Sequence, residues 1–385
     1  MRILHTSDWH VGRTIRGRSR ATEHVAVLRE LADIAAREQV DLVIVAGDVF
    51  DTSAPTAEAE RIAYRALLDL VGTGAQVVIV AGNHDNPGRL AAVRPLLDLA
   101  GVHVGAFLAA PSDGGVLVLR ARSGEDVRVA LLPFLSQRSI IKADELMALD
   151  ADQHAGRYAE RCRQIVEVLT GGFERDTVNL VAAHLTVVGG ALGGGERMAH
   201  TIFDYHVPPQ VFPATAHYVA LGHLHRAQRI PSQTPVWYSG SPLALDFGEA
   251  DEAKSALIID ATPGVPARVT QVPLTQGRRL RTIEGTLDDI EAQRGRHDDA
   301  YLRVVVTEAR RAGLSDQVRE WFPDAVDVTI AVDTPTAATD DDLAGLQSSP
   351  HELFSEYLRT TGVDDPAVTA LFDQLLEDEH APDAA

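Results

Sequence analysis

The feature that most constrains this chain is a repeated pattern in which a short apolar run ends in a glycine and then in polar side chains. The runs are Leu42–Ala46 and Val77–Ala81, followed by Gly47-Asp48 and by Gly82-Asn83-His84-Asp85. Their β-branched residues predict buried strands, and each glycine allows the backbone to turn sharply. Helical patterns alternate with these strands, which indicates a layered α/β domain. The polar residues then lie just past the carboxyl ends of the strands, where open α/β sheets bind their ligands.

Three further predicted strands end in the same way. Arg2–Thr6 precedes Asp8 and His10, Asn179–Ala183 precedes His184, and Tyr218–Leu221 precedes His223 and His225. Burying so many polar groups without partners would cost several kcal/mol for each group. Asp8 and His10 are two residues apart, so an extended backbone would place both side chains on one face. The sequence therefore predicts one shared metal site, with the ligands Asp8, His10, Asp48, Asn83, His184, His223 and His225.

Seven ligands are too many for one first-row ion but suit a pair of ions held about 3.5–4 Å apart across a bridging carboxylate, for which Asp48 is the natural choice. The nitrogen and oxygen donors favour Mn²⁺, Fe or Zn²⁺ over Ca²⁺. Cys162 is the only cysteine, which excludes a thiolate zinc site and a disulfide framework and favours a reducing cytoplasm.

His84 and Asp85 follow the predicted ligand Asn83 directly. In this position His84 is expected to contact a phosphate or to protonate a leaving group. Asp85 has two interpretations: it orients His84, or its side chain stabilises the turn.

A basic loop stands out in a chain whose formal net charge is −20. Such a charge argues against nucleic-acid binding, although much of the acid lies in the last third of the chain and bound cations would offset part of it. Arginine side chains suit phosphate oxygens. We therefore predict a nucleic-acid contact in this loop, with a solvated loop as the alternative; its arginines are Arg13, Arg16, Arg18 and Arg20.

The character of the chain changes near Pro273, which predicts several parts. They are a main domain over 1–272, a small α/β domain over 273–333, a linker over 334–349, an amphipathic helix pair over 350–378 and a tail over 379–385. The helix pair is too small to form its own core, so it is expected to dock onto another protein. No apolar run has the length of a membrane span, and no signal-peptide pattern is visible, so a cytoplasmic location is expected.

Together, the motifs Asp-x-His, Gly-Asp-x-x-Asp, Gly-Asn-His-Asp, a lone strand-end His and Gly-His-x-His resemble those of the calcineurin-like metallophosphoesterase superfamily. The resemblance implies a four-layer α-β-β-α sandwich. It also implies that the small domain over 273–333 caps the site and binds DNA. Within that superfamily, Ser-Asp-Trp-His-Val-Gly-Arg, Ala-Gly-Asp-Val-Phe-Asp, Gly-His-Leu-His and Ser-Gly-Ser-Pro resemble the SbcD family of bacterial nuclease subunits.

This resemblance implies a distribution of the ligands between two divalent ions, Mn²⁺ in the first place with Mg²⁺ as an alternative. Asp8, His10, Asp48 and His225 would hold one ion, and Asp48, Asn83, His184 and His223 the other. His84 would be catalytic. Archaeal and eukaryotic relatives have a second active-site His where this chain has Asp51, and we assign Asp51 and Asp85 to the same catalytic set.

The resemblance also implies an activity and partners. The activity is a 3'-5' exonuclease on double-stranded ends and an endonuclease on single strands and hairpins, working in DNA repair, recombination and replication. The partner is an SMC-like SbcC-type ATPase that controls the nuclease with ATP, in a heterotetramer at the nucleoid. Dimer contacts would come from Thr56–Val71 and Gly88–Leu99. The alternatives are a stand-alone metallophosphoesterase acting on a small phosphodiester or phosphoprotein, and a non-catalytic scaffold, which would require lost ligands.

Overall fold

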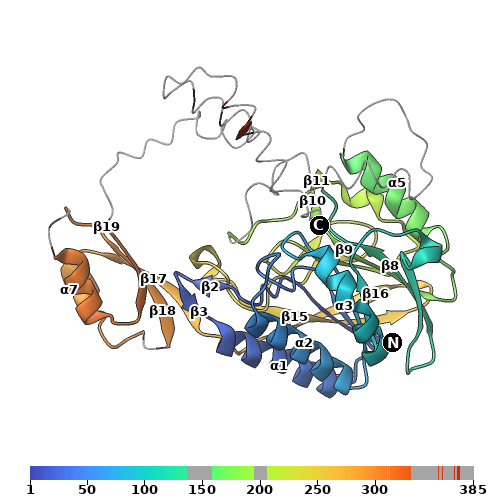
Figure 1. The fold of residues 1–385 in the computed structure, drawn as a ribbon, viewed down its shortest axis with the longest axis horizontal. Helices are drawn as coiled ribbons and strands as arrows, with labels where there is room; N and C mark the ends of the chain where they lie inside the picture. Colours follow the sequence, from blue (N-terminus) through green and yellow to red (C-terminus); the bar gives the residue numbers. More distant parts are fainter. Residues whose placement is uncertain are drawn as a thin grey trace.

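A computed structural model describes residues 1–136, 158–194, 206–297, 299–309, 311 and 313–330, and five single residues nearer the C-terminus. Two six-stranded sheets form the centre of the main domain. Figure 1 shows helices α1 and α2 on one side of the sheets and helix α5 on the other. Within the described ranges, no helix has both the length and the apolar character that crossing a membrane requires.

The first sheet contains the strands that the opening pattern predicted. Strands β1, β4, β5 and β6 are parallel; beyond β1 the sheet continues with β15, which is antiparallel to β1, and with β16, which is antiparallel to β15. In spatial order the strands are β16 (Val265–Pro273), β15 (Ser255–Thr262), β1 (Arg2–Thr6), β4 (Leu42–Val45), β5 (Gln76–Val80) and β6 (Val102–Gly105). Helices α1 (Ala21–Arg37), α2 (Ala57–Gly72) and α3 (Pro87–Ala100) cover its outer face.

The second sheet has a central group of parallel strands, β8, β9, β12 and β14, with an antiparallel strand at each edge. In spatial order they are β13 (Gln228–Ile230), β14 (Val236–Tyr238), β12 (Tyr218–Gly222), β9 (Val178–His184), β8 (Asp126–Leu132) and β7 (Val116–Arg120). Helix α5 (Tyr158–Thr170) packs on its outer face.

The alternation of side chains along β4 explains why the two sheets stack. Val43 and Val45 belong to the core shared with α1 and α2, whereas Ile44 belongs to the core shared with the second sheet, where Leu180 and Ala220 also lie. Successive residues of a strand point to opposite faces, so a strand apolar at every position must be covered on both faces. The four-layer α-β-β-α sandwich is therefore confirmed.

The small domain is a three-stranded parallel sheet, drawn in orange at one end of the molecule in Figure 1. Its elements are β17 (Arg279–Gly285), α6 (Leu287–Glu291), β18 (Ala300–Val306), α7 (Leu314–Trp321) and β19 (Ala325–Ile330). It has its own apolar core. The hairpin of β2 (Thr14–Ile15) and β3 (Arg18–Ser19) lies between the two domains.

Three strands of the first sheet had no counterpart among the predictions: β6, β15 and β16. Strand β6 is only four residues long, and β16 is an edge strand whose side chains are all exposed or half-buried, so neither shows a strong apolar pattern. The signal for β15 was present, in the buried run Ala256–Ile259.

The predicted linker, most of the predicted helix pair and the tail lie outside the described residues. Five described positions in the helix-pair region are helical: Phe354, Leu358, Val368, Leu371 and Phe372. The rings of Phe354 and Phe372 stack with their centroids 3.9 Å apart.

Candidate metal centre

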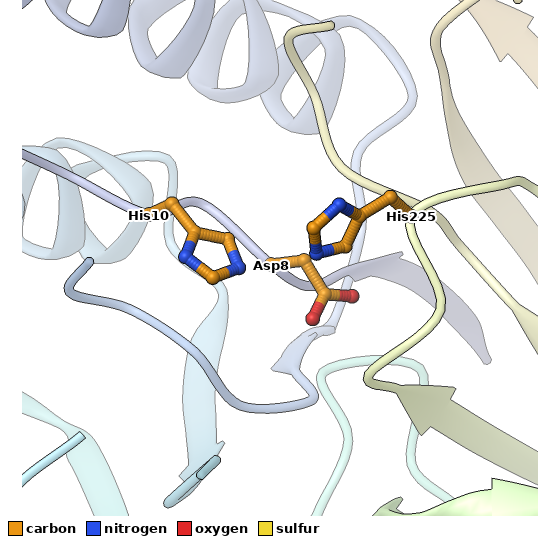
Figure 2. A group of neighbouring side chains, drawn as sticks. All are labelled: Asp8, His10 and His225. Atoms are coloured by element: carbon orange, nitrogen blue, oxygen red, sulfur yellow. The ribbon is translucent and has the colours of Figure 1, made fainter. Parts of the chain in front are cut away.

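The carboxyl ends of β1, β4, β5, β9 and β12 meet at one edge of the two sheets. The structure brings the predicted ligands together there, and all of them except Asn83 are buried. Three overlapping groups have ligand atoms within 4.8 Å of one another. They are Asp8 with His10 and His225, Asp8 with Asp48 and His184, and His10 with Asp48 and His84. Figure 2 shows the rings of His10 and His225 on either side of the Asp8 side chain.

The backbone of these loops is unusual. Six non-glycine residues in the described part of the chain have positive φ, and four of them are predicted ligands: Asp8 at 52°, His10 at 46°, Asp48 at 51° and His223 at 104°. The extended geometry proposed for Asp8 and His10 is therefore wrong, because both are left-handed. Such conformations cost of order 1–3 kcal/mol each and concentrate at functional sites.

Two glycines allow the strand ends to approach each other. A Cβ on Gly47, whose φ is 92°, would lie 2.2 Å from Nδ1 of His184. A Cβ on Gly222 would lie 1.9 Å from the carbonyl oxygen of Ala46. Both positions therefore require glycine for the two sheets to place their ligands in one site.

Asp48 occupies the position expected of a bridging ligand. Its Oδ2 lies 3.5 Å from Nε2 of His10 and 3.5 Å from Nε2 of His184. Its Oδ1 accepts a hydrogen bond of 2.8 Å from the backbone N–H of His84. On the other side, Oδ1 of Asn83 lies 2.9 Å from Nε2 of His184 and 2.8 Å from Nδ1 of His223. The Asp48 carboxylate thus lies between His10 and His184.

The site fits a pair of cations. Nε2 of His10 is buried and has no hydrogen-bond partner among the described residues, although Oδ2 of Asp48 lies near it. Buried polar atoms are nearly always paired, and a metal ion would supply the partner. Two buried carboxylates, an amide oxygen and four imidazoles form a donor set that suits first-row divalent metals.

Without a cation, the charges of the site act on one another. Burial raises the pKa of Asp8 to about 6 and lowers that of His10 to about 4. Burial alone would lower the pKa of His184, but the Asp48 carboxylate outweighs it and raises that pKa to about 9. Burial likewise opposes ionisation of Asp48, yet the nearby imidazoles hold its pKa well below its usual value. In the absence of a metal ion, a proton on His184 therefore balances the negative charge of the Asp48 carboxylate.

Two imidazole rings, those of His184 and His225, are oriented by hydrogen bonds that their Nδ1 atoms donate. Nδ1 of His184 donates to the Ala46 carbonyl oxygen at 2.8 Å, and Nδ1 of His225 donates to Oε1 of Glu249 at 2.8 Å. Both rings therefore keep Nε2 for a metal. Glu249, on the short helix η5 (Phe247–Glu249), is fully buried, and no local motif marks it in the sequence. Burial would raise its pKa, but the bonds from His225 and Lys254 lower it to about 2.

The structure separates the three residues assigned to catalysis. Nδ1 of His84 donates to the backbone oxygen of Asp51 at 2.7 Å, which leaves Nε2 of His84 for substrate. The Asp51 carboxylate lies 3.2 Å from Nδ1 of His10 and 3.3 Å from Nη1 of Arg13. Asp51 is therefore placed to orient His10 and His84.

Of the two interpretations of Asp85, the geometry favours the turn. Its carboxylate accepts backbone N–H bonds from Gly82 at 2.9 Å, Phe50 at 3.0 Å and Val49 at 3.3 Å. The Nδ1 atom of His84 is bonded to Asp51 instead. Asp85 therefore joins the turns that follow β4 and β5.

The arginine loop needs a correction. Arg16 and Arg18 pair with Asp327 and Asp324 of the small domain, each at 3.0 Å. Arg20 is buried and bonds to Glu23 and to the carbonyl oxygen of Ala244, so the prediction that it contacts nucleic acid is wrong. Only Arg13 lies beside the metal centre, through Asp51. The acidic partners of Arg16 and Arg18 lie about three hundred residues further along the chain, and local sequence could not reveal them.

Comparison with known families agrees with this geometry. A family model described as calcineurin-like phosphoesterase matches residues 1–227. A second one, described as type 5 capsule protein repressor C-terminal domain, matches residues 276–361.

Similar proteins include the SbcD subunits of the nuclease SbcCD from several bacteria. The chain is 41% identical over 325 residues to the SbcD subunit of Bacillus subtilis, covering 82% of this chain and 81% of that protein. It is 35% identical over 306 residues to the SbcD subunit of Escherichia coli K12, covering 76% and 73%. Among solved structures, a dimetal phosphatase from Danio rerio covers 70% of this chain and 98% of its own, at 13% identity and a TM-score of 0.42.

Proposed function

Because this chain belongs to the calcineurin-like phosphoesterase family, and within it to the SbcD nuclease subunits, we propose that it is the DNA-cleaving subunit of an ATP-controlled complex. It is a hydrolase of phosphodiester bonds. The observation that carries the proposal is the meeting of the seven predicted ligands, with His84 beside them, at one edge of the sandwich.

Each group in this centre has a chemical task. Asp8, His10, Asp48 and His225 would hold one ion, and Asp48, Asn83, His184 and His223 the other. Such a pair of ions supplies a nucleophilic hydroxide at neutral pH and offsets the charge of the phosphate. The carbonyl oxygen of Asp51 keeps the proton of His84 on Nδ1 in the neutral ring, so Nε2, once protonated, would donate to a phosphate oxygen or to the leaving oxygen. Asp51 and Glu249 keep the rings of His10 and His225 in position.

For the substrate we propose DNA, cleaved as a 3'-5' exonuclease at double-stranded ends and as an endonuclease on single strands and hairpins. The names of the relatives support a nuclease. The small domain would cap the bound DNA. Mn²⁺ is the proposed ion, with Mg²⁺ as the alternative, since both accept carboxylate and amide oxygens while Mn²⁺ binds imidazole more strongly.

The proposed partner is an SbcC-type ATPase, because the relatives are named as one subunit of a two-part complex. Its docking element would be the helix pair of 350–378. The stacked rings of Phe354 and Phe372 support a paired arrangement there. Cytoplasmic action at the nucleoid would follow from this partnership.

A homodimer is also proposed. Helices α2 and α3 carry exposed leucines, with exposed fractions of 47% for Leu68, 71% for Leu96 and 87% for Leu99. Leu96 and Leu99 are three residues apart on α3 and so lie on one face of that helix, and contiguous apolar patches on a surface mark interaction sites. Two copies joined through these helices would hold two active sites at a fixed spacing within a heterotetramer.

The decisive experiment incubates the purified protein with Mn²⁺ and either a hairpin DNA or a cyclic nucleotide. We expect the hairpin to be cut and the cyclic nucleotide to remain. Turnover of the cyclic nucleotide with intact DNA would favour a stand-alone phosphoesterase, and turnover of neither substrate, by the protein alone or with the ATPase and ATP, would favour a scaffold.

A further inference from the structure

The predicted ligand His225 is held by a hydrogen-bond network that no sequence motif indicated. Oε1 of Glu249 accepts the Nδ1 proton of His225 at 2.8 Å, and both side chains are buried. A carboxylate only accepts hydrogen bonds here, so the partner atom must be N–H and the other ring nitrogen keeps its lone pair. Glu249 therefore fixes both the tautomer and the ring orientation of His225.

Glu249 is itself fixed on its second oxygen. Oε2 accepts from Nζ of Lys254 at 2.6 Å and from the backbone N–H of Leu245 at 3.0 Å. Lys254 also donates to the backbone oxygen of His225 at 3.1 Å and to the hydroxyl of Ser241 at 3.0 Å. The network thus begins at the ring of His225 and closes on its backbone, and it leaves His225 little freedom to rotate.

The helical turn that carries Glu249 also faces the small domain. Phe247, two residues earlier, is buried in an apolar cluster with Ile15, Leu280 and Tyr301. The guanidinium group of Arg303 lies 5.0 Å from the centre of the Phe247 ring. One short turn therefore contacts the small domain at one end and a metal ligand at the other.

A second connection leads from the small domain to the same metal position. The β2–β3 hairpin begins four residues after His10 and contributes Ile15 to the same cluster, while Arg16 bonds to Asp327. His10 and His225 form one ligand group with Asp8. By contrast, His184 of the other position is held by Ala46, inside the sandwich.

We infer that Glu249 is a positioning residue for His225. We also infer that the turn Phe247–Glu249 couples the metal position of Asp8, His10 and His225 to the position of the small domain against the main domain. The inference rests on the proposed metal pair but not on DNA as the substrate. Movement of the small domain would change the affinity of one metal position and leave the other intact.

The test measures Mn²⁺ binding by calorimetry with the full-length protein. Glu249→Gln should weaken one of two binding events about 10–100-fold, as loss of such a partner does at other metal sites. Glu252→Gln is the matched control, because Glu252 also pairs with Lys254, at 3.2 Å, yet bonds to no metal ligand among its described contacts. In the His225→Ala background, Glu249→Gln should cause no further loss of Mn²⁺ affinity. In the His184→Ala background, it should cause its full loss of Mn²⁺ affinity. This comparison separates positioning of His225 from a general loss of stability.

The coupling is tested from the small-domain side. Arg303→Ala and Phe247→Ala should weaken the same binding event, Phe247→Leu should restore it, and Arg281→Ala, an exposed position on the same sheet, should change nothing. Normal binding of both ions by Glu249→Gln would overturn the positioning role. Normal binding by Arg303→Ala and by both Phe247 variants would overturn the coupling. A wild-type protein that binds no Mn²⁺ would overturn this inference and the proposed function, whereas one that binds two ions without cutting DNA would overturn the nuclease alone.

Discussion

At the scale of single residues, hydrogen-bond direction separates the roles of similar side chains. His84 and His184 both donate from Nδ1 to a backbone carbonyl oxygen, of Asp51 and Ala46 respectively. Nε2 of His184 faces the Asp48 carboxylate, the proposed bridge, and the side-chain oxygen of Asn83. His84 is bonded through its backbone N–H to Asp48 and follows Asn83, so it lies next to two of the predicted ligands. The same residue type is therefore proposed as a ligand in one case and as a substrate-facing group in the other.

Replacing His84 tests that division. His84→Gln should bind Mn²⁺ nearly as the wild type does and should lower turnover by about 10²–10⁴-fold, the usual contribution of a general acid. Calorimetry gives the first quantity and single-turnover cleavage of hairpin DNA the second. Full activity would show that the assigned role is wrong, and the loss of one bound ion would make His84 a ligand.

The pH dependence of metal binding follows from the charges of the site. Burial raises the pKa of Asp8 to about 6, and Asp48, against the effect of burial, raises that of His184 to about 9. Ligands must lose their protons to bind metal, so Mn²⁺ has to displace the His184 proton near neutral pH. The Mn²⁺ affinity should therefore increase as pH rises from about 6 to about 9. Calorimetry in two buffers of different ionisation enthalpy should show proton release at neutral pH, and a constant affinity would contradict this account.

At the scale of elements, the centre depends on the alignment of strand ends. Asp85 joins the turns after β4 and β5 by accepting bonds from Gly82, Val49 and Phe50. Gly222 allows β12 of the second sheet to approach Ala46 of the first. These contacts bring the predicted ligands of different strands close to one another.

Removing the Asp85 carboxylate should therefore affect the fold before it affects chemistry. Asp85→Ala leaves buried N–H groups unpaired and should lower the free energy of unfolding by roughly 2–4 kcal/mol. Asp98→Ala, at a half-exposed position on α3, should change it by less than about 0.5 kcal/mol. Urea unfolding of both variants provides the measurement. Wild-type stability with lost turnover would restore Asp85 to the catalytic set.

At the scale of the whole molecule, the two domains are joined by specific contacts. Glu30 of α1 accepts bonds from the backbone N–H groups of Thr275 and Gln276, and Glu23 accepts from that of Arg278. Arg278 also lies over the ring of Tyr301, at 4.6 Å from its centroid. The segment between the domains is thus fixed along α1, and the small domain has a defined position near the metal centre.

Deleting the residues after Ser349 tests the proposed partner contact. The deletion should abolish capture of the SbcC-type ATPase, because the helix pair would supply the docking surface. Basal Mn²⁺-dependent cleavage should remain, since every predicted ligand lies before residue 226. A pull-down and a cleavage assay on the same preparation suffice, and unchanged capture would refute the docking assignment.

The sequence by itself determined the sandwich, and it predicted the side chains that the structure brings together at one edge of the sheets. Apolar runs such as Leu42–Ala46 specify buried strands locally. Buried donors such as Asp48 and His184 need partners, so the energetic cost of burial favours their meeting in one site. The SbcD motifs added the division between two ions. Edge strand β16 was beyond this reasoning, because its mostly exposed side chains carry no apolar pattern.

Only the tertiary structure decided what the supporting residues do. Arg20 belongs to the basic loop and Glu249 to no local motif, and the structure buries both beside partners. Arg16 and Arg18 face acids of the small domain, and Asp85 bonds to two turns. These roles depend on contacts between segments far apart in the chain, whereas strand and ligand patterns can be recognised from a few neighbouring residues.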